Sequence, residues 1–222
     1  MTPDTNMFEL NDFFENNDLV RGHHILVNNV NPYDTTFFDR YTAEDYARQE
    51  NQYRELRKDY IKKRIKSQEP TMFEKALFEK PLILLHLRKI AEPYDVIGLN
   101  GCCVPGLRKF FVYTNGRIYP CERVMRAYNI GDVDKGIEIS KIISIAGEYA
   151  MNSENDCINC WAAKVCGACF ATAVKNNRFD IVRKRERCEV LKMAKHIDFV
   201  TYATIMEANP NAFDFTKDME IA

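Results

Sequence analysis

The sequence has no long hydrophobic run and no excess of charge of one sign. Its 222 residues carry 31 Lys and Arg against 32 Asp and Glu, which gives a formal net charge of -1. Balanced charge argues against a protein that binds nucleic acid through bulk basicity and against a disordered acidic tail. Apolar runs such as PLILL fall far short of the ~20 residues that a membrane-spanning helix needs. We therefore expect neither nucleic acid nor a membrane among its partners.

The N-terminal residues MTPDTNMFELNDFFENND lack the basic start and apolar stretch of a secretory signal, so the expected location is cytoplasmic. No arrangement of Ser, His and Asp, or of Cys and His, indicates a catalytic nucleophile. Cysteine is absent before Cys102, and all eight cysteines fall between Cys102 and Cys188. In a reducing compartment such a concentration of thiols indicates metal binding rather than disulfides.

Hydrophobic periodicity predicts helices over residues 43–66, 135–150 and about 182–208, and two helical pieces within 71–91 with Pro81 starting the second. The apolar run 24–27 predicts a buried strand. A polar stretch, residues 152–156, leads into the cysteine-rich segment. The predicted buried stripe of the 135–150 helix consists of Ile139, Ile142, Ile143, Ala146 and Tyr149.

A β-hairpin is predicted around Asn115 and Gly116, because residues rich in β-formers flank a dipeptide that tolerates positive φ. In a two-residue loop the facing residues are Thr114 and Arg117, Val112 and Tyr119, and Phe110 and Cys121. This turn would bring Cys121 to the end of the ribbon where Cys102 and Cys103 enter it.

The segment CINCWAAKVCGAC, residues 157–169, has the pattern C-x2-C-x5-C-x2-C. Thiolates bind zinc and iron–sulfur clusters because both are soft enough to prefer sulfur. A two-knuckle zinc site separates its pairs by about 15–20 residues, which is much more than here. Four sulfurs on so tight a loop could close one site, but eight cysteines make two sets of four, the number that each 4Fe–4S cluster takes.

The sequence resembles the SPASM domain, the auxiliary-cluster extension of radical S-adenosylmethionine enzymes. The resemblance lies in the order and spacing of Cys103, Gly116, Cys121, the cysteine segment 157–169 and Cys188. Cys169 departs from the family pattern, since it comes one residue early. The strings NGCCVPGLRKFFVYTNGRIYPCERV, NIGDV and DCINCWAAKVC are similar to maturases of cysteine-rich or CXXX-repeat ribosomal peptides.

The resemblance implies two 4Fe–4S clusters, which relay electrons or bind the substrate peptide during its modification. Carried over by position, the ligands of auxiliary cluster I are Cys102, Cys103, Cys121 and Cys169. Those of auxiliary cluster II are Cys157, Cys160, Cys166 and Cys188. Adjacent cysteines can both ligate one cluster only in a strained turn. Whether Cys102 or Cys103 ligates therefore stays open, as does whether cluster I keeps an open iron.

The resemblance also implies an α+β fold class. Residues 1–99 would form the tail of a partial α/β barrel, a strand followed by helices. Residues 100–190 would form the SPASM hairpin and cluster loops, and residues 191–222 a C-terminal helix and tail. The family's C-x3-C-x2-C motif for the S-adenosylmethionine-cleaving cluster is missing from this sequence.

We therefore expect the C-terminal part of a peptide maturase that is inactive alone, with S-adenosylmethionine used only by the complete enzyme. Its partners would be a ribosomally made peptide and a radical S-adenosylmethionine core chain. Two other interpretations remain open. One is a zinc-stapled interaction module without a redox role. The other is a separate partner subunit that presents a peptide to a radical S-adenosylmethionine chain.

Overall fold

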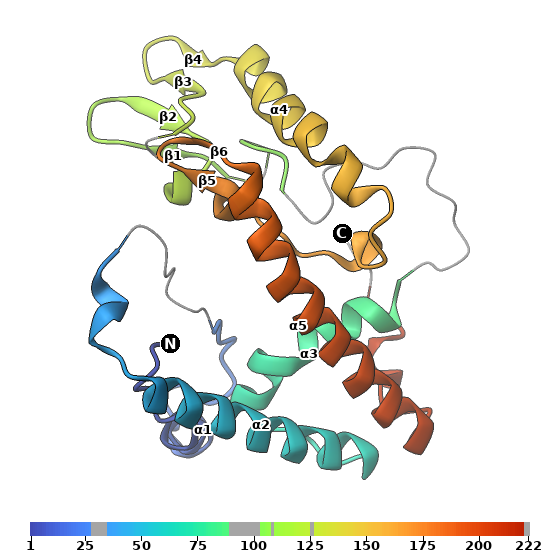
Figure 1. Ribbon diagram of the computed structural model, residues 1–222. Helices are drawn as coiled ribbons and strands as arrows, with labels where there is room; N and C mark the ends of the chain where they lie inside the picture. The colour runs from blue at the N-terminus through green and yellow to red at the C-terminus, as the bar shows by residue number, and fades with distance from the viewer. Residues whose placement is uncertain (28–34, 89–102, 108, 125–126, 220–222) are drawn as a thin grey trace. The chain divides into compact units, whose positions relative to one another are not determined.

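Figure 1 shows the chain as a computed structural model that describes residues 1–27, 35–88, 103–107, 109–124 and 127–219. Helices are combined with short antiparallel strands, so the fold belongs to the predicted α+β class. The chain divides into two compact units, Met1–Ile90 with Ile197–Ala222, and Ala91–His196. The long helix α5 (Ile181–Ala208) contributes to both units.

The first unit is helical over the residues described. It contains α1 (Met7–Asn16), α2 (Ala43–Ile65), α3 (Met72–His86), the end of α5, and 3₁₀ turns at Phe37–Arg40 and Asp214–Thr216. Both α2 and α3 begin with a capping box. Thr42 and Asp45 form the box of α2, and Thr71 and Glu74 form that of α3. These side chains satisfy N–H groups that the first turn of a helix leaves unpaired.

Aromatic side chains fill the core of the first unit. Tyr60, Phe73 and Phe213 are fully buried. The ring centroid of Phe213 lies 5.4 Å from that of His86 and 5.6 Å from that of Tyr202. Nδ1 of His86 and the hydroxyl of Tyr202 are 2.8 Å apart, which links α3 to the end of α5. Stacked and tilted rings of this kind add to the stabilisation from burial.

The expected barrel remnant is wrong. The described segments contain no barrel, and residues 24–27 form no regular secondary structure. Leu26 is 78% exposed, so the apolar run is not a buried strand. A strand is stable only where neighbouring strands and a buried face support it, and the described first unit supplies neither for this run.

The second unit carries every strand that the structure describes (Figure 1). Four of them form an antiparallel sheet in the order β1-β2-β3-β4, and β5 pairs with β6 in a separate hairpin. Their bounds are β1 Phe111–Val112, β2 Arg117–Tyr119, β3 Gly131–Asp132, β4 Gly136–Ile137, β5 Val174–Lys175 and β6 Arg178–Phe179. Helix α4 (Ile139–Cys157) follows the sheet, and its buried Ile145 and Tyr149 share a core with Ile118, Ile130 and Phe170.

The hairpin lies where it was predicted, but its register is shifted by one residue. Phe111 pairs with Tyr119 and Val112 with Ile118, instead of Val112 with Tyr119. The Tyr113 N–H donates to the Arg117 carbonyl at 2.9 Å, which leaves a three-residue loop. Gly116 ends that loop at φ +82°, in the left-handed region that glycine tolerates.

The predicted helix over 43–66 and the long last helix are confirmed as α2 and α5. The prediction of two pieces within 71–91 is wrong, because α3 runs unbroken through Pro81. The helix predicted over 135–150 begins later and continues through the polar stretch to Cys157. Its buried face also differs, since Ile139 and Ile143 are exposed. None of the described helices is both long and apolar enough to cross a lipid bilayer.

Candidate metal centre

The cysteines predicted as ligands belong to the second unit, and Cys102 lies outside the described residues. The other seven are free thiols. Cys103 is exposed and Cys121 is buried, while five are half-buried: Cys157, Cys160, Cys166, Cys169 and Cys188. Partial burial shelters a sulfur from solvent without closing it off from a ligand.

Charge effects connect four thiols that come from two helices and the loop between them. We call Cys157, Cys160, Cys166 and Cys188 the four-cysteine group. Burial raises the pKa of the Cys166 thiol, and negative charge on Cys157 and Cys160 raises it further. Burial also raises the pKa of Cys188, with further increases from Cys166 and Cys157. Such charge effects are significant only between groups that lie near one another.

Cys121 and Cys169 form a second, smaller set, which we call the cysteine pair. Burial raises the pKa of Cys121, and negative charge on Cys169 adds to this. Hydrogen bonds from the backbone of Arg123 and Val124 oppose the increase. Backbone N–H groups directed at sulfur stabilise the thiolate, the form of cysteine that binds metal.

Tight turns place the thiols of residues 157–169. Cys157 is the last residue of α4, and the Cys160 N–H donates back to its carbonyl at 3.1 Å. A 3₁₀ turn, Ala163–Val165, precedes Cys166, whose N–H donates to the Ala163 carbonyl at 3.4 Å. These turns keep the backbone of the cysteine segment tightly folded.

Charge effects thus relate the four cysteines that the resemblance assigns to cluster II, and two of those that it assigns to cluster I. No three His, Cys, Asp or Glu side chains within the described ranges lie close enough to hold a metal ion. Neither the four-cysteine group nor the set of Cys103, Cys121 and Cys169 therefore forms a ready-made site for a single ion. A cubane cluster spans more space than a single ion, so its thiolates stand farther apart than those of a zinc site.

One buried lysine contacts the four-cysteine group. The side chain of Lys184, in the first turns of α5, is only 4% exposed. Its Nζ donates to the sulfur of Cys157 at 3.6 Å and lies 3.9 Å from Oδ2 of Asp156. Asp156 itself accepts two hydrogen bonds from Arg185, at 2.9 and 3.1 Å, and these contribute most to lowering its pKa.

The sequence does not single out Lys184 or Asp156. Lys184 is one of several cations before Cys188, and Asp156 ends a stretch that reads as a polar linker. A usable signal was the spacing of four between Lys184 and Cys188, which puts both on one face of a helix.

No family model matches the chain, and no curated protein or solved structure matches it. The assignment of this site therefore depends on the cysteines and on the groups around them. Trp161, which lies inside the cysteine loop, is 57% exposed.

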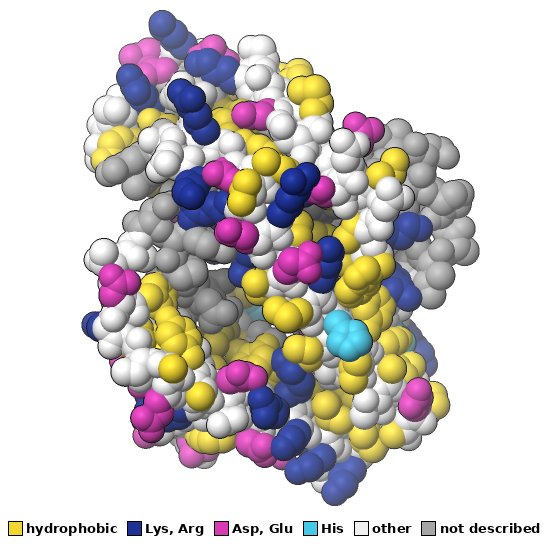
Figure 2. Space-filling view, in the orientation of Figure 1, with side chains coloured by type: hydrophobic (Ala, Val, Ile, Leu, Met, Phe, Trp, Pro, Cys, Tyr) yellow, Lys and Arg dark blue, Asp and Glu magenta, His cyan; other side chains and the backbone are white. Residues whose placement is uncertain are grey.

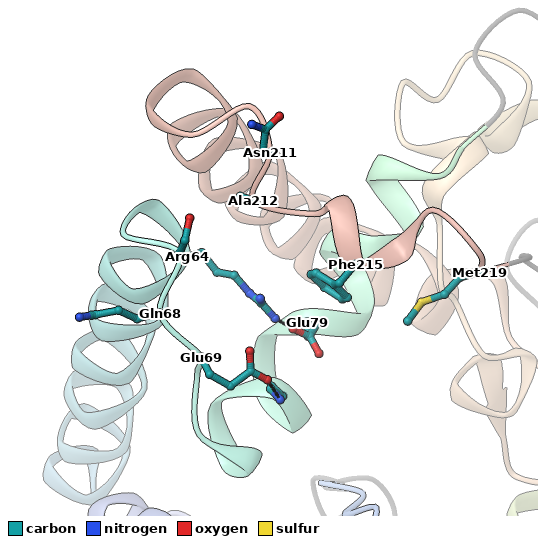
Figure 3. Close-up of a pocket in the computed structure, with 10 residues that line it drawn as sticks. Arg64, Gln68, Glu69, Glu79, Asn211, Ala212, Phe215 and Met219 are labelled. Atoms are coloured by element: carbon teal, nitrogen blue, oxygen red, sulfur yellow. Dashed lines mark hydrogen bonds and ion pairs between the residues drawn. The ribbon is translucent and has the colours of Figure 1, made fainter.

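The first unit contains a cavity of about 380 Å³, which is unrelated to the cysteines (Figure 3). Figure 3 shows Arg64 extending into it towards Glu79 and Phe215. Arg64 forms an ion pair with Glu79, and its guanidinium lies 4.5 Å from the centroid of the Phe215 ring. Lys75 is paired with Glu69. Every charged residue that lines this cavity already has an ionic partner, so its polar groups stabilise the helices.

Charges of both signs are mixed over the surface in view (Figure 2). On α2, Lys58 pairs with Glu55 at 2.7 Å and Lys62 with Asp59 at 3.2 Å. Pairs at this spacing on an exposed helix contribute only a few tenths of a kcal/mol each, to an order of magnitude. These acidic partners nevertheless offset part of the positive charge near the C-terminal end of α2.

Proposed function

We propose that this chain binds two 4Fe–4S clusters and acts as the auxiliary-cluster part of a radical S-adenosylmethionine enzyme that modifies ribosomally made peptides. The four-cysteine group would hold auxiliary cluster II. The cysteine pair would hold auxiliary cluster I together with Cys102 or Cys103. The single observation that carries the proposal is the four-cysteine group, in which negative charge on neighbouring cysteines raises the pKa of Cys166 in the loop and of Cys188 in α5.

The donor set supports iron–sulfur chemistry. Every candidate ligand is a thiol, and soft sulfur donors suit iron–sulfur clusters and zinc alike. Among the described residues no three His, Cys, Asp or Glu side chains are close enough to hold a single metal ion. A cysteine-rich site of this kind stays reduced and available for metal in the cytosol, where we place the protein.

A buried hydroxyl one helical turn before Cys157 also supports the proposal. Oγ of Ser153 is buried and has no hydrogen-bond partner among the described residues. Ser153 lies four residues before Cys157 in α4, so both are on one face of the helix. An unpaired buried hydroxyl costs about 1–3 kcal/mol, so it should meet an acceptor in the functional state. A cluster sulfide or a ligating thiolate would supply that acceptor.

The clusters, when bound, would supply one-electron redox chemistry or a binding site for the peptide. The residues of this chain would hold them, exclude water through the half-buried loop, and fix their electrostatic surroundings. The C-x3-C-x2-C motif that generates the substrate radical is not among the 222 residues. The radical-generating chemistry would come from another segment or chain that carries this motif.

Anaerobic reconstitution with ferrous salt and sulfide tests the proposal. We expect about eight iron and eight acid-labile sulfide per chain, since each cluster contains four of each. Retention of zinc with no labile sulfide would instead support a zinc-stapled module and overturn the proposal. A parallel reconstitution with zinc alone provides the control, because it shows whether the same thiols accept a single ion.

A further inference from the structure

The buried ammonium of Lys184 needs a negative partner. A charge removed from water is costly unless an opposite charge or hydrogen-bond acceptor compensates it. With its side chain 4% exposed, Lys184 has little access to water. Two acceptors are near its Nζ, the Cys157 sulfur at 3.6 Å and the Asp156 carboxylate at 3.9 Å.

The carboxylate of Asp156 cannot fully compensate the charge of Lys184, because it already accepts hydrogen bonds from Arg185. Arg185 donates to both carboxylate oxygens of Asp156, at 2.9 and 3.1 Å. Such paired, charge-assisted bonds are stronger and more directional than a contact at 3.9 Å. The remaining partner of Lys184 is therefore the sulfur of Cys157, and a negative charge on that sulfur would complete the neutralisation.

The other cations near Cys188 are placed differently. Nη1 of Arg183 donates to the Val174 carbonyl at 2.6 Å. The side chain of Arg185 is 61% exposed. Lys192 lies one turn beyond Cys188, but its side chain is 36% exposed and pairs with Glu189 at 2.8 Å. Solvent screens exposed charges far more than buried ones, so Lys184 is the cation best placed to act on the four-cysteine group.

We propose that Lys184 is a positioning residue that raises the reduction potential of the cluster held by the four-cysteine group. This inference rests on the proposed function. One-electron reduction adds one negative charge to an already anionic cluster and its thiolates. A fixed cation beside one thiolate stabilises the reduced state more than the oxidised state, and hydrogen bonds to sulfur act in the same direction. The effect is large where the dielectric constant is low.

The test compares reduction potentials of the reconstituted full chain by anaerobic dye-mediated titration, followed by electron paramagnetic resonance. Lys184→Gln should lower the potential of one cluster by about 59 mV, a roughly tenfold loss in the equilibrium constant for one-electron reduction. The other cluster should be unaffected. The matched control is Lys192→Gln, which removes the same charge one turn beyond Cys188, and it should produce a much smaller shift because solvent screens Lys192.

A second variant tests the opposite direction. Asp156→Asn removes the anion that competes for Lys184 and should raise the potential of the same cluster. This result keeps the inference testable even if Lys184→Gln does not fold. Equal potentials in the wild type and in both Lys184→Gln and Asp156→Asn would overturn the role of Lys184 while the iron content still upholds the proposed function. A wild-type chain that takes up no iron would overturn both.

Discussion

Cys166 and Cys188 come from different parts of the second unit, yet negative charge on Cys166 raises the pKa of the Cys188 thiol. Cys166 follows a 3₁₀ turn in the cysteine loop, and Cys188 lies in α5. Their proximity depends on the path of the chain through the β5–β6 hairpin, which returns the backbone to the start of α5. Tertiary structure therefore brings together sulfurs that the sequence separates.

Paired cysteine variants test which thiols share a cluster. Cys188→Ser should lower the iron content of the reconstituted chain from about eight to about four, because removing one of its thiolates destabilises auxiliary cluster II. Adding Cys157→Ser should remove little more, since both residues serve the same cluster. Combining Cys188→Ser with Cys121→Ser should remove nearly all iron. Iron and sulfide analysis gives the readout, and equal losses in the two double variants would contradict the division.

A glycine pair tests the sheet that leads to Cys121. A Cβ at Gly131 would lie 2.2 Å from the carbonyl oxygen of Gly136, so Gly131→Ala forces the β3–β4 hairpin apart. We expect a loss of about 1–3 kcal/mol in the free energy of unfolding, measured by urea denaturation. The control is Gly147→Ala in α4, where the added Cβ meets nothing within 4 Å. That change should stabilise the helix by about 1 kcal/mol. Equal stability of the two variants would contradict the register.

A substitution in the core of the first unit should lower the stability of the chain strongly without reducing its iron content. Phe213 is 0% exposed and packs against His86 and Tyr202. Phe213→Ala should therefore cost about 3–5 kcal/mol of unfolding free energy. Leu19→Ala, at a side chain 84% exposed, should change it by less than about 0.5 kcal/mol. Iron uptake should be unaffected in both variants, because the described cysteines all belong to the second unit.

Tyr128 predicts how stability changes at high pH. Burial raises the pKa of its phenol to about 12, and Glu148, which accepts its hydrogen bond at 3.2 Å, adds to the increase. The unfolded chain loses this proton near pH 10, about two units before the folded chain does. The contribution to stability is thus complete below pH 10 and declines as the pH rises towards 12.

Ultraviolet titration of phenolate absorbance should show a late transition to which Tyr128 contributes, and Glu148→Gln should move the contribution of Tyr128 to lower pH. In Tyr128→Phe, the corresponding decline in unfolding free energy above pH 10 should be smaller than in the wild type. An unchanged decline would show that Tyr128 is not its source.

The long helices were predictable from sequence, whereas the continuity of α3 through Pro81 was not. Thr42 and Asp45 form a capping box that the sequence displays directly, and α2 begins there. Pro81 removes one backbone hydrogen bond from α3, but the buried Phe78, Leu82 and Leu85 hold the helix together across it. Tertiary packing therefore outweighs the local signal for a break.

The hairpin shows a different limit of sequence reasoning. Asn115 and Gly116 fit both a two-residue loop and a three-residue loop that ends in a glycine with positive φ. The pairing of Tyr113 with Arg117 selects the longer loop, and this shifts every pair along the ribbon by one residue. Similarly, the polar residues 152–156 give no apolar period, although they extend α4 to Cys157.

The sequence predicts the candidate cysteine ligands, but it does not predict the groups that surround them. The number of cysteines and the family resemblance predicted two sets of four. The contact between Lys184 and Cys157 depends on how α5 lies against the end of α4, which no local pattern encodes. The unpaired hydroxyl of Ser153 likewise becomes evident only when its burial is known.

Mössbauer spectroscopy of the full chain reconstituted with isotopically enriched iron tests the central claim most directly, because it separates cubane clusters from isolated ions. We predict that nearly all the iron belongs to oxidised, diamagnetic 4Fe–4S clusters, at about eight iron per chain. A spectrum that contains only isolated iron in four-thiolate sites, or a chain without bound iron, would contradict the account.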